Sequence, residues 1–405
     1  MKSSAAILAL AIASIPAPAF AAPPQAPATP QPAPSEPKMS AKASAAILAL
    51  QTAITSHDTA NIPAKLAAAQ AAATTPADRY WLARVQLNGA IAANDLAAAR
   101  TQVDAIAGTN VLPAPTIADI YTKLGNSFMA KKQYDDAVGA FQKASALTPN
   151  DTNLLMLMAR ARAEQGNKAE AAAAVQRAIA VSKASGTKPS ENLYRNAVGL
   201  AYEANLPASI GLAREWLEAY PSADSWRNAL AIYRNLNGGD TDNLVDVTRL
   251  SLLTNAMQTA NNYEAFAAQA IEERNFGEAK AAIDAGIAAG KLQPTDAGVK
   301  ELLAATKGQI PTEASLASAE KAANIPTAFI RVGDRYYAAG NYSKAAALYR
   351  EALAKGADSN LANLRLGEAL ARAGDKPGAT AALNAVGGSR AELAKFWLVY
   401  VQTHD

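Results

Sequence analysis

The feature that most constrains this chain is a pattern that returns every 34 residues. Gly333 lies in the segment FIRVGDRY, and Gly367, 34 residues later, lies in LRLGEAL. An earlier glycine, Gly125, lies in YTKLGNSF, and 34 residues after it Ala159 lies in LLMLMARAR. Self-similarity at such a period is typical of repeat proteins, in which each unit packs on its neighbours in the chain. The sequence therefore predicts two pairs of repeats that are in register.

Each unit is expected to be a pair of antiparallel helices. The small residue is followed twelve residues later by alanine, and four residues after that by a larger apolar residue: Ala137 and Phe141, Ala171 and Val175, Ala345 and Tyr349, Ala379 and Leu383. A small residue there allows the first helix to approach the second at the alanine, where a larger side chain would separate them. Glycines at 166, 340 and 374 supply the left-handed turn that ends each first helix.

This combined pattern resembles the tetratricopeptide-repeat (TPR) family. The resemblance implies an all-α fold, an α-solenoid of stacked helix-turn-helix (TPR) repeats that form a right-handed superhelix with a concave surface. It covers nearly all of the chain after residue 39, with divergent copies in the middle. It also implies a protein that binds other proteins and is not an enzyme, because no stretch is left over for a catalytic domain.

These anchors predict the organisation of the whole chain. The expected segments are a signal peptide over 1–21, a proline- and alanine-rich linker over 22–39, divergent helical repeats over 40–117, a TPR block over 118–221, further divergent repeats over 222–325, a second TPR block over 326–388 and a capping helix over 389–405. The last segment contains Phe396, Trp397 and Tyr400. We expect these rings to close the last repeat, and a homodimer contact is the alternative.

The first residues have the pattern of an export signal. Lys2 precedes an apolar stretch from Ala5 to Ile15, and Ala19-Phe20-Ala21 fits a cleavage site. The apolar stretch is too short to span a membrane, and the mature chain is expected to have no transmembrane segment; a short uncut anchor is the alternative. The chain contains no cysteine, which excludes disulfides and fits a bacterial periplasm. We therefore expect a periplasmic or secreted bacterial protein.

Composition and motifs argue against several classes of function. The net charge is only +3, whereas a nucleic-acid-binding protein needs a dense basic face. The two histidines, His57 and His404, have no second metal ligand at a suitable spacing. No nucleophile elbow, zinc-protease helix or dinucleotide loop is present. The sequence therefore predicts no nucleic-acid partner, no cofactor, no metal and no catalytic residue.

In the TPR family the first helix of each repeat lines the concave groove. Carried onto this sequence, the resemblance implies a partner-binding groove formed by Asp119, Lys123, Asn126, Arg160, Arg331, Asp334, Tyr337, Arg365, Glu368 and Arg372. The family's carboxylate clamp is not expected, since only Asn126 matches it, and Thr122 and Leu157 stand where lysine and asparagine are needed.

Two hypotheses follow for the second TPR block. Arg331 and Arg365 are 34 residues apart, so their guanidinium groups should lie side by side, with Asp334 and Glu368 one turn along. Either these four residues pair with one another across the repeat interface, or the two arginines bind an acidic or carboxylate-bearing segment of a partner, with Tyr337 beside it.

The sequence as a whole predicts an exported scaffold or adaptor whose groove binds a peptide or helix of a protein partner in the cell envelope. The alternative is an accessory component of envelope polysaccharide, peptidoglycan or outer-membrane assembly that contacts glycan directly.

Overall fold

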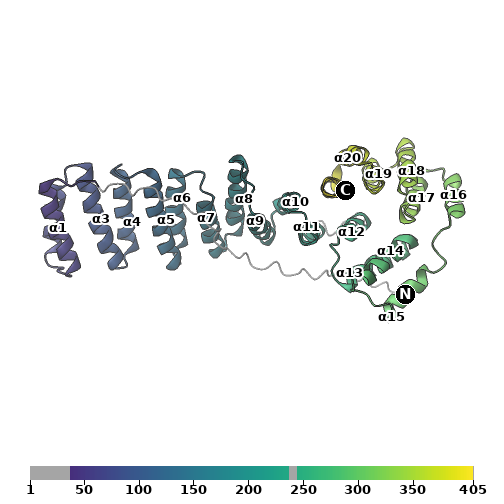
Figure 1. Ribbon diagram of the computed structural model, residues 1–405, viewed down its shortest axis with the longest axis horizontal. Helices are drawn as coiled ribbons and strands as arrows, with labels where there is room; N and C mark the ends of the chain where they lie inside the picture. The colour runs from purple at the N-terminus through teal and green to yellow at the C-terminus, as the bar shows by residue number, and fades with distance from the viewer. Residues whose placement is uncertain (1–36, 237–243, 405) are drawn as a thin grey trace. The chain divides into compact units, whose positions relative to one another are not determined.

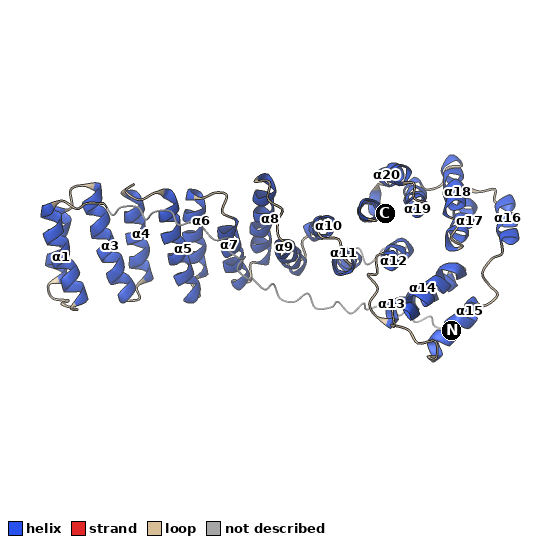
Figure 2. Ribbon diagram, in the orientation of Figure 1, coloured by secondary structure: helices blue, strands red, loops and turns tan. Residues whose placement is uncertain are grey.

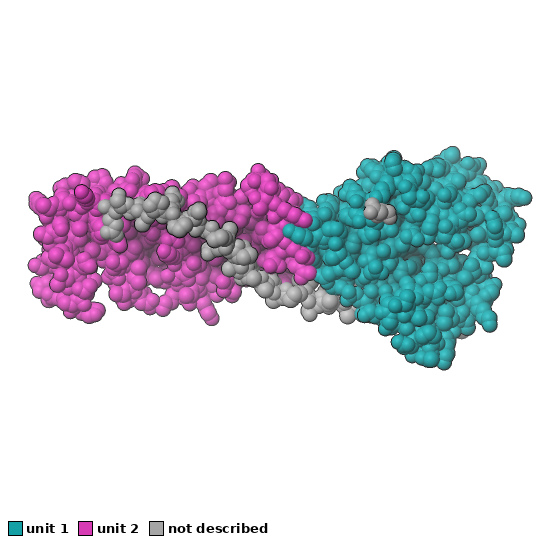
Figure 3. Space-filling view, in the orientation of Figure 1, with its two compact units in different colours: residues 1–15, 207–405 teal, residues 16–206 magenta. Residues whose placement is uncertain are grey.

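The computed structural model describes residues 37–236 and 244–404, and these residues form α-helices joined by turns (Figure 1). No strand occurs among them (Figure 2), so the all-α prediction is confirmed. The chain divides into two compact units that meet in sequence at Leu206 and Pro207 (Figure 3). The expected signal peptide and residues 22–36 of the expected linker lie outside the described residues.

The N-terminal unit, described from residue 37 to 206, stacks helical hairpins along the chain. Its helices are α1 (Ala41–Thr55), α2 (Ile62–Ala72), α3 (Pro76–Ala92), α4 (Leu96–Gly108), α5 (Ala114–Ala130), α6 (Tyr134–Leu147), α7 (Thr152–Glu164), α8 (Lys168–Ala184) and α9 (Glu191–Glu203). Each odd-numbered helix up to α7 packs on the helix that follows it.

The C-terminal unit, described over 207–236 and 244–404, continues the helical pairs. Its helices are α10 (Ala208–Ala219), α11 (Ala223–Leu236), α12 (Leu244–Leu253), α13 (Ala260–Glu272), α14 (Phe276–Ala288), α15 (Ala297–Thr306), α16 (Glu313–Ala322), α17 (Pro326–Ala338), α18 (Tyr342–Ala354), α19 (Ser359–Arg372), α20 (Lys376–Asn384) and α21 (Ala391–Thr403), with a short 3-10 helix at Gly388–Arg390. None of the described helices in either unit has the length and apolar character that crossing a bilayer requires.

The turns inside the repeats have the geometry that the sequence predicts. Gly340 and Gly374 have φ angles of 77° and 82°, in the left-handed region that glycine adopts without strain. The next residue caps the N-terminus of the second helix in each case. Asn341 Oδ1 accepts from the backbone N–H of Lys344 at 3.2 Å, and Asp375 Oδ1 accepts from that of Gly378 at 2.9 Å. Local chemistry therefore ends one helix and starts the next.

The predicted close approach of the two helices is present, but its partner is different. A Cβ atom built on Gly333 would lie 2.6 Å from Cε1 of Tyr349. Gly125 meets the ring of Phe141 in the same way, and Gly367 meets Leu383. The expected partner was the alanine twelve residues on. The structure places the larger residue sixteen residues on at the contact, because that side chain fills the space that the glycine leaves.

The last helix closes the C-terminal unit. Phe396 and Trp397 on α21 are fully buried, and Phe396 packs edge-on against Tyr233 of α11 with 5.9 Å between ring centroids. Arg214 on α10 is 2.9 Å from Glu392 on α21. Helix α21 therefore contacts the first helices of its unit as well as α19 and α20. Both rings are therefore buried within the chain, and Tyr400, the third ring of this segment, is partly buried.

The glycine contact predicts a stability effect at Gly333. Replacing it by leucine should lower the free energy of unfolding by about 1 to 3 kcal/mol or more, because the side chain would overlap the ring of Tyr349. Gly333→Ala should act in the same direction. Gly211→Ala on α10 is the matched control, since a Cβ there meets nothing within 4 Å and alanine is the better helix former. Thermal unfolding measures all three, and an unchanged Tm for Gly333→Leu would refute the assigned register.

Candidate functional site

The first helices of the N-terminal unit present an exposed polar face. Asp119, Lys123 and Asn126 are exposed on α5 and lie at positions i, i+4 and i+7, on one side of the helix. The opposite side buries Phe128 in the core that α5 shares with its neighbours. Arg160 is exposed on α7, the first helix of the next hairpin. We call these four exposed residues the first-helix face.

The charged side chains of the first-helix face form only a weak, exposed ion pair. Lys123 Nζ lies 2.8 Å from Asp119 Oδ2, and their side chains are 75% and 58% exposed. An ion pair in water contributes only about 0 to 1 kcal/mol and is screened by salt. Both groups can therefore exchange this pairing for contacts with a partner at little cost.

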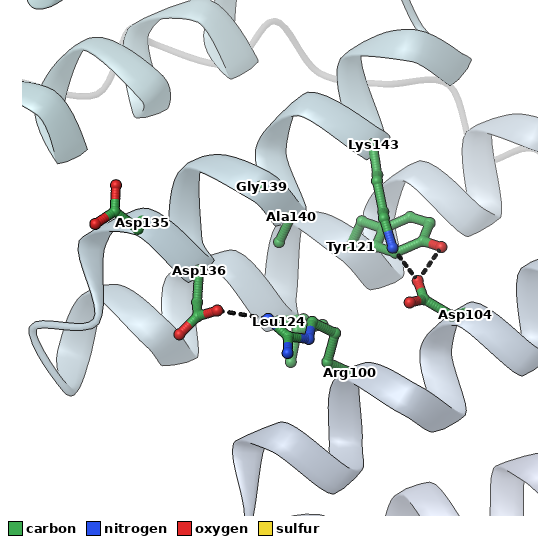
Figure 4. Close-up of a pocket in the computed structure, with 9 residues that line it drawn as sticks. All are labelled: Arg100, Asp104, Tyr121, Leu124, Asp135, Asp136, Gly139, Ala140 and Lys143. Atoms are coloured by element: carbon green, nitrogen blue, oxygen red, sulfur yellow. Dashed lines mark hydrogen bonds and ion pairs between the residues drawn. The ribbon is translucent and has the colours of Figure 1, made fainter.

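A shallow pocket that the sequence does not predict lies between α4 and α6 (Figure 4). Its volume is about 200 Å³. Arg100 pairs with Asp136 at 2.5 Å, and Lys143 Nζ lies 2.6 Å from Asp104 Oδ1. The hydroxyl of Tyr121 donates to the same oxygen of Asp104 at 2.7 Å. The charges at its rim thus bond to one another across the two helices and tie neighbouring hairpins together.

Asp104 also affects the tyrosine of this pocket. Burial of the phenol, together with the hydrogen bond to Asp104 and its negative charge, raises the pKa of Tyr121 well above its usual value. The phenol therefore remains a neutral donor at physiological pH. It contributes a hydrogen bond to the tie between α4 and α5 and offers no acid–base chemistry.

The C-terminal unit contains a cluster of buried charges around Arg249 on α12. Its side chain is 2% exposed. Nε and Nη2 donate to the two carboxylate oxygens of Glu278 on α14 at 2.6 and 3.0 Å, and Nη1 donates to Oε2 of Glu368 on α19 at 3.1 Å. The guanidinium carbon lies 4.4 Å from the ring centroid of Tyr337 on α17. One cation therefore contacts three helices besides its own.

A second guanidinium extends this cluster. Arg365 on α19 donates through Nε to Oδ1 of Asp246 on α12 at 3.3 Å, and its Nη1 pairs with Oδ2 of Asp334 on α17. The other oxygen of Asp334 accepts from the hydroxyl of Tyr349 at 2.8 Å. We call Arg249, Arg365, Asp246, Glu278, Asp334 and Glu368 the charge network.

The charge network has more carboxylates than guanidinium groups. Oδ2 of Asp246 and Oε1 of Glu368 are buried and have no hydrogen-bond partner in the described part of the chain. Burial raises the pKa of Glu368 well above its usual value, and the negative charge of Asp246 adds to this, against the opposing effect of Arg249 and Arg365. The buried position and the excess of carboxylates therefore both oppose ionisation of Glu368.

In the second TPR block, Arg365 pairs with Asp334 of the preceding repeat, as the first of the two hypotheses expects, and the two arginines do not form an open ladder. Arg331 is exposed, whereas Arg365 at the equivalent position is only 12% exposed and is engaged by Asp334 and Asp246. The buried members of the predicted set are Asp334, Tyr337 and Glu368. Arg372 is partly buried and donates to the hydroxyl of Tyr342 at 2.7 Å. Helix α12 contributes to this burial, because Arg249 contacts Asp334, Glu368 and the ring of Tyr337, and Asp246 contacts Arg365.

The sequence analysis missed Asp246, Arg249 and Glu278. The two residues on α12 stand in the segment LVDVTRLSLL, where two ionisable residues interrupt an otherwise apolar or hydroxyl-bearing run. Charges in such a run have to be buried with partners if the helix is in a core, and that signal was available. Nothing in the local pattern identified the partners, which come from helices 29 to 119 residues away.

The histidines lie apart from both clusters. His57 is exposed in the turn after α1 with a φ angle of 55°, and His404 stacks on Tyr400 at 4.3 Å. Over 37–236 and 244–404, no three histidine, aspartate or glutamate side chains are placed to hold a metal ion.

The raised pKa of Glu368 predicts a pH dependence of stability. A carboxyl whose pKa is higher in the folded than in the unfolded chain stabilises the fold fully below the unfolded value of about 4.3, and this stabilisation is lost as the pH rises toward the folded value. Glu368→Gln resembles the protonated form at every pH. The free energy of unfolding of the variant relative to the wild type should therefore rise with pH above about 4.3, by at most about 1.4 kcal/mol per pH unit.

Thermal unfolding of both proteins between pH 4.5 and 8.5 measures this difference. Other titrating groups, such as Asp78, whose pKa is lowered, are common to both chains and cancel. A difference that does not change with pH would show that Glu368 titrates normally in the folded chain.

Comparisons with known proteins agree with the helical hairpins. Two family models described as tetratricopeptide repeat match the chain, one over residues 85–152 and 332–390 and the other over residues 128–183. No curated protein sequence matches at a significant level.

Several solved structures are similar at low identity. The MamA protein is 16% identical, with 44% of this chain and 92% of that chain covered and a TM-score of 0.29. A tetratricopeptide repeat protein from Parabacteroides merdae is 11% identical, with 72% and 99% covered and a TM-score of 0.29. The TPR2AB domain of yeast Sti1, solved as a pHSP90 complex, is 15% identical, with 71% and 99% covered and a TM-score of 0.25. TM-scores below 0.5 do not establish a shared overall fold. The family matches show that this chain contains tetratricopeptide-repeat segments, within residues 85–183 and 332–390.

Proposed function

We propose that this protein is an exported bacterial scaffold that binds a segment of a protein partner in the cell envelope through the first-helix face of its N-terminal unit. Tetratricopeptide repeats generally mediate protein–protein interactions. The export signal pattern at the N-terminus and the absence of cysteine support the envelope location.

The observation that carries the proposal is the different exposure of equivalent first-helix residues. Asp119, Lys123, Asn126 and Arg160 are exposed, and within residues 37–236 and 244–404 the only ion pair that any of them makes joins Asp119 to Lys123. In the C-terminal unit, Asp334 and Glu368 are buried by the chain itself. This difference in exposure supports the first-helix face as the surface that a partner contacts.

The chemistry of the first-helix face favours a polar protein segment over a glycan. Glycan binding relies on exposed aromatic rings, and the aromatic residues of α5, Tyr121 and Phe128, are buried. Asp119, Lys123 and Arg160 offer both signs of charge and hydrogen-bonding groups of fixed spacing along stacked helices. Such a face suits a peptide or helix with complementary charges.

A charge-reversal pair tests the proposal. Lys123→Glu with Arg160→Glu should reduce the partner retained from an envelope extract at least tenfold, because both cations of the face are lost. Lys65→Glu with Arg177→Glu is the matched control, since both residues are exposed on the second helices α2 and α8 and the net charge changes equally. Circular dichroism checks that both variants are folded.

Equal retention by the two variants would exclude the first-helix face as the binding surface. Retention of envelope polysaccharide or peptidoglycan, with no protein whose binding depends on Lys123 and Arg160, would instead favour the glycan-contacting alternative.

Export itself is tested by intact mass. We expect the mature protein to begin at or near Ala22, after the Ala19-Phe20-Ala21 site. A chain isolated from the producing cells that retains Lys2 would contradict cleavage and would favour the uncut anchor.

A further inference from the structure

Helix α12 is enclosed within the C-terminal unit, since every residue from Val245 to Ser251 is buried. Its two charged side chains reach α17 and α19, which are the first helices of the second TPR segment and line the groove in this family. The groove positions Asp334, Tyr337 and Glu368 are the ones that these contacts cover.

The contacts of Arg249 are those of arginine recognition. Glu278 receives the planar edge formed by Nε and Nη2 with both oxygens, Glu368 receives Nη1, and the ring of Tyr337 lies against the guanidinium. A two-pronged carboxylate contact combined with an aromatic face distinguishes arginine from lysine, whose ammonium is a point charge. The site therefore selects an arginine side chain.

The occupant fits this site imperfectly. Helix α12 brings Asp246 into a cluster that already contains Glu278, Asp334 and Glu368. One oxygen of Asp246 and one of Glu368 are left buried without a hydrogen-bond partner. A buried, unsatisfied acceptor opposes burial. An arginine-bearing helix without an acid three residues before the arginine would satisfy the same carboxylates and would not add this negative charge.

We infer that the groove formed by α17, α19 and Glu278 of α14 is a recognition site for an arginine-bearing helical segment of a partner protein, and that α12 is its displaceable internal occupant. This site is separate from the first-helix face of the N-terminal unit. It also reverses the charge of the ligand expected from the sequence, since the groove offers carboxylates and an aromatic ring where two open arginines were predicted.

Because α12 occupies the site, a partner must exceed a minimum affinity to displace it. A segment tethered in the same chain competes at an effective concentration of the order of millimolar. A partner therefore displaces α12 only if it fits the charges better or gains additional contacts. The site is closed to weak, non-specific arginine-containing segments.

A peptide experiment on the full chain tests the inference. The probe is a synthetic peptide of residues 244–254 with Asp246→Asn, and the control peptide also has Arg249→Gln. The Arg249→Gln chain lacks the internal guanidinium and should bind the probe at least tenfold more tightly than the wild type does. Arg331→Gln is the matched protein control, because Arg331 is exposed on α17 outside the charge network. It should behave as the wild type.

The control peptide should bind the Arg249→Gln chain at least tenfold more weakly than the probe. Equal binding of the two peptides, or equal binding of the probe to all three chains, would overturn the inference. Binding at the first-helix face is distinguished by Lys123→Glu with Arg160→Glu, which should leave probe binding unchanged.

Hydrogen exchange of the wild-type chain tests the displacement of α12 directly, so the result does not depend on whether a variant folds. The amides of α12 should exchange at least tenfold faster than those of α17 and α19, because the helix leaves its groove while the repeats stay folded. A saturating amount of the probe should accelerate exchange in α12 and slow it in α17 and α19. Exchange of all three helices at one rate, unchanged by the probe, would identify α12 as a fixed core helix and end the proposal.

Discussion

Burying the guanidinium of Arg249 is the constraint on which the C-terminal unit depends. A cation removed from water needs carboxylates and hydrogen-bond acceptors in place of its hydration. Here Glu278 and Glu368 supply them from α14 and α19, which are far apart in the sequence. The helices can satisfy Arg249 only if they converge on α12. One side chain therefore links the divergent middle of the unit to its last repeats. Separately, α21 contacts α10 and α11, so the last helix of the unit packs on its first two.

The same repeat chemistry has opposite consequences in the two units. In both, a glycine on the first helix meets a large side chain on the second, so the hairpins are alike: Gly125 with Phe141, and Gly333 with Tyr349. The outer faces differ because, among the described residues, α12 contacts the first helices α17 and α19 of the C-terminal unit. Lys123 remains largely in water, while Arg365 is almost enclosed. Exposure of a groove position is thus decided by what the rest of the chain supplies and not by the repeat.

This difference also explains what the sequence could and could not predict. The repeat period, the left-handed glycine turns and the tight glycine contacts are local, and each was visible in a window of about 34 residues. The buried state of Asp334 and Glu368 depends on Arg249, which is 85 and 119 residues away in the chain. The pattern treats Arg331 and Arg365 as equivalent. Arg365 differs because it contacts Asp334 of the preceding repeat and Asp246 of α12, and no local rule predicts where an intervening helix docks.

The charge network is difficult to explain by stability alone. Buried ion pairs are often no more stabilising than apolar side chains of similar volume, because desolvation offsets the attraction between the charges. The unpartnered oxygens of Asp246 and Glu368 add a further cost. Valine or leucine at these positions would fill the groove without either penalty. What charges supply instead is directional selection of the occupant, since Glu278 and Tyr337 accept a guanidinium in one orientation only. A hydrophobic core does not require this selectivity for arginine. The charges are therefore better explained if the groove is a recognition surface that a helix of its own chain fills.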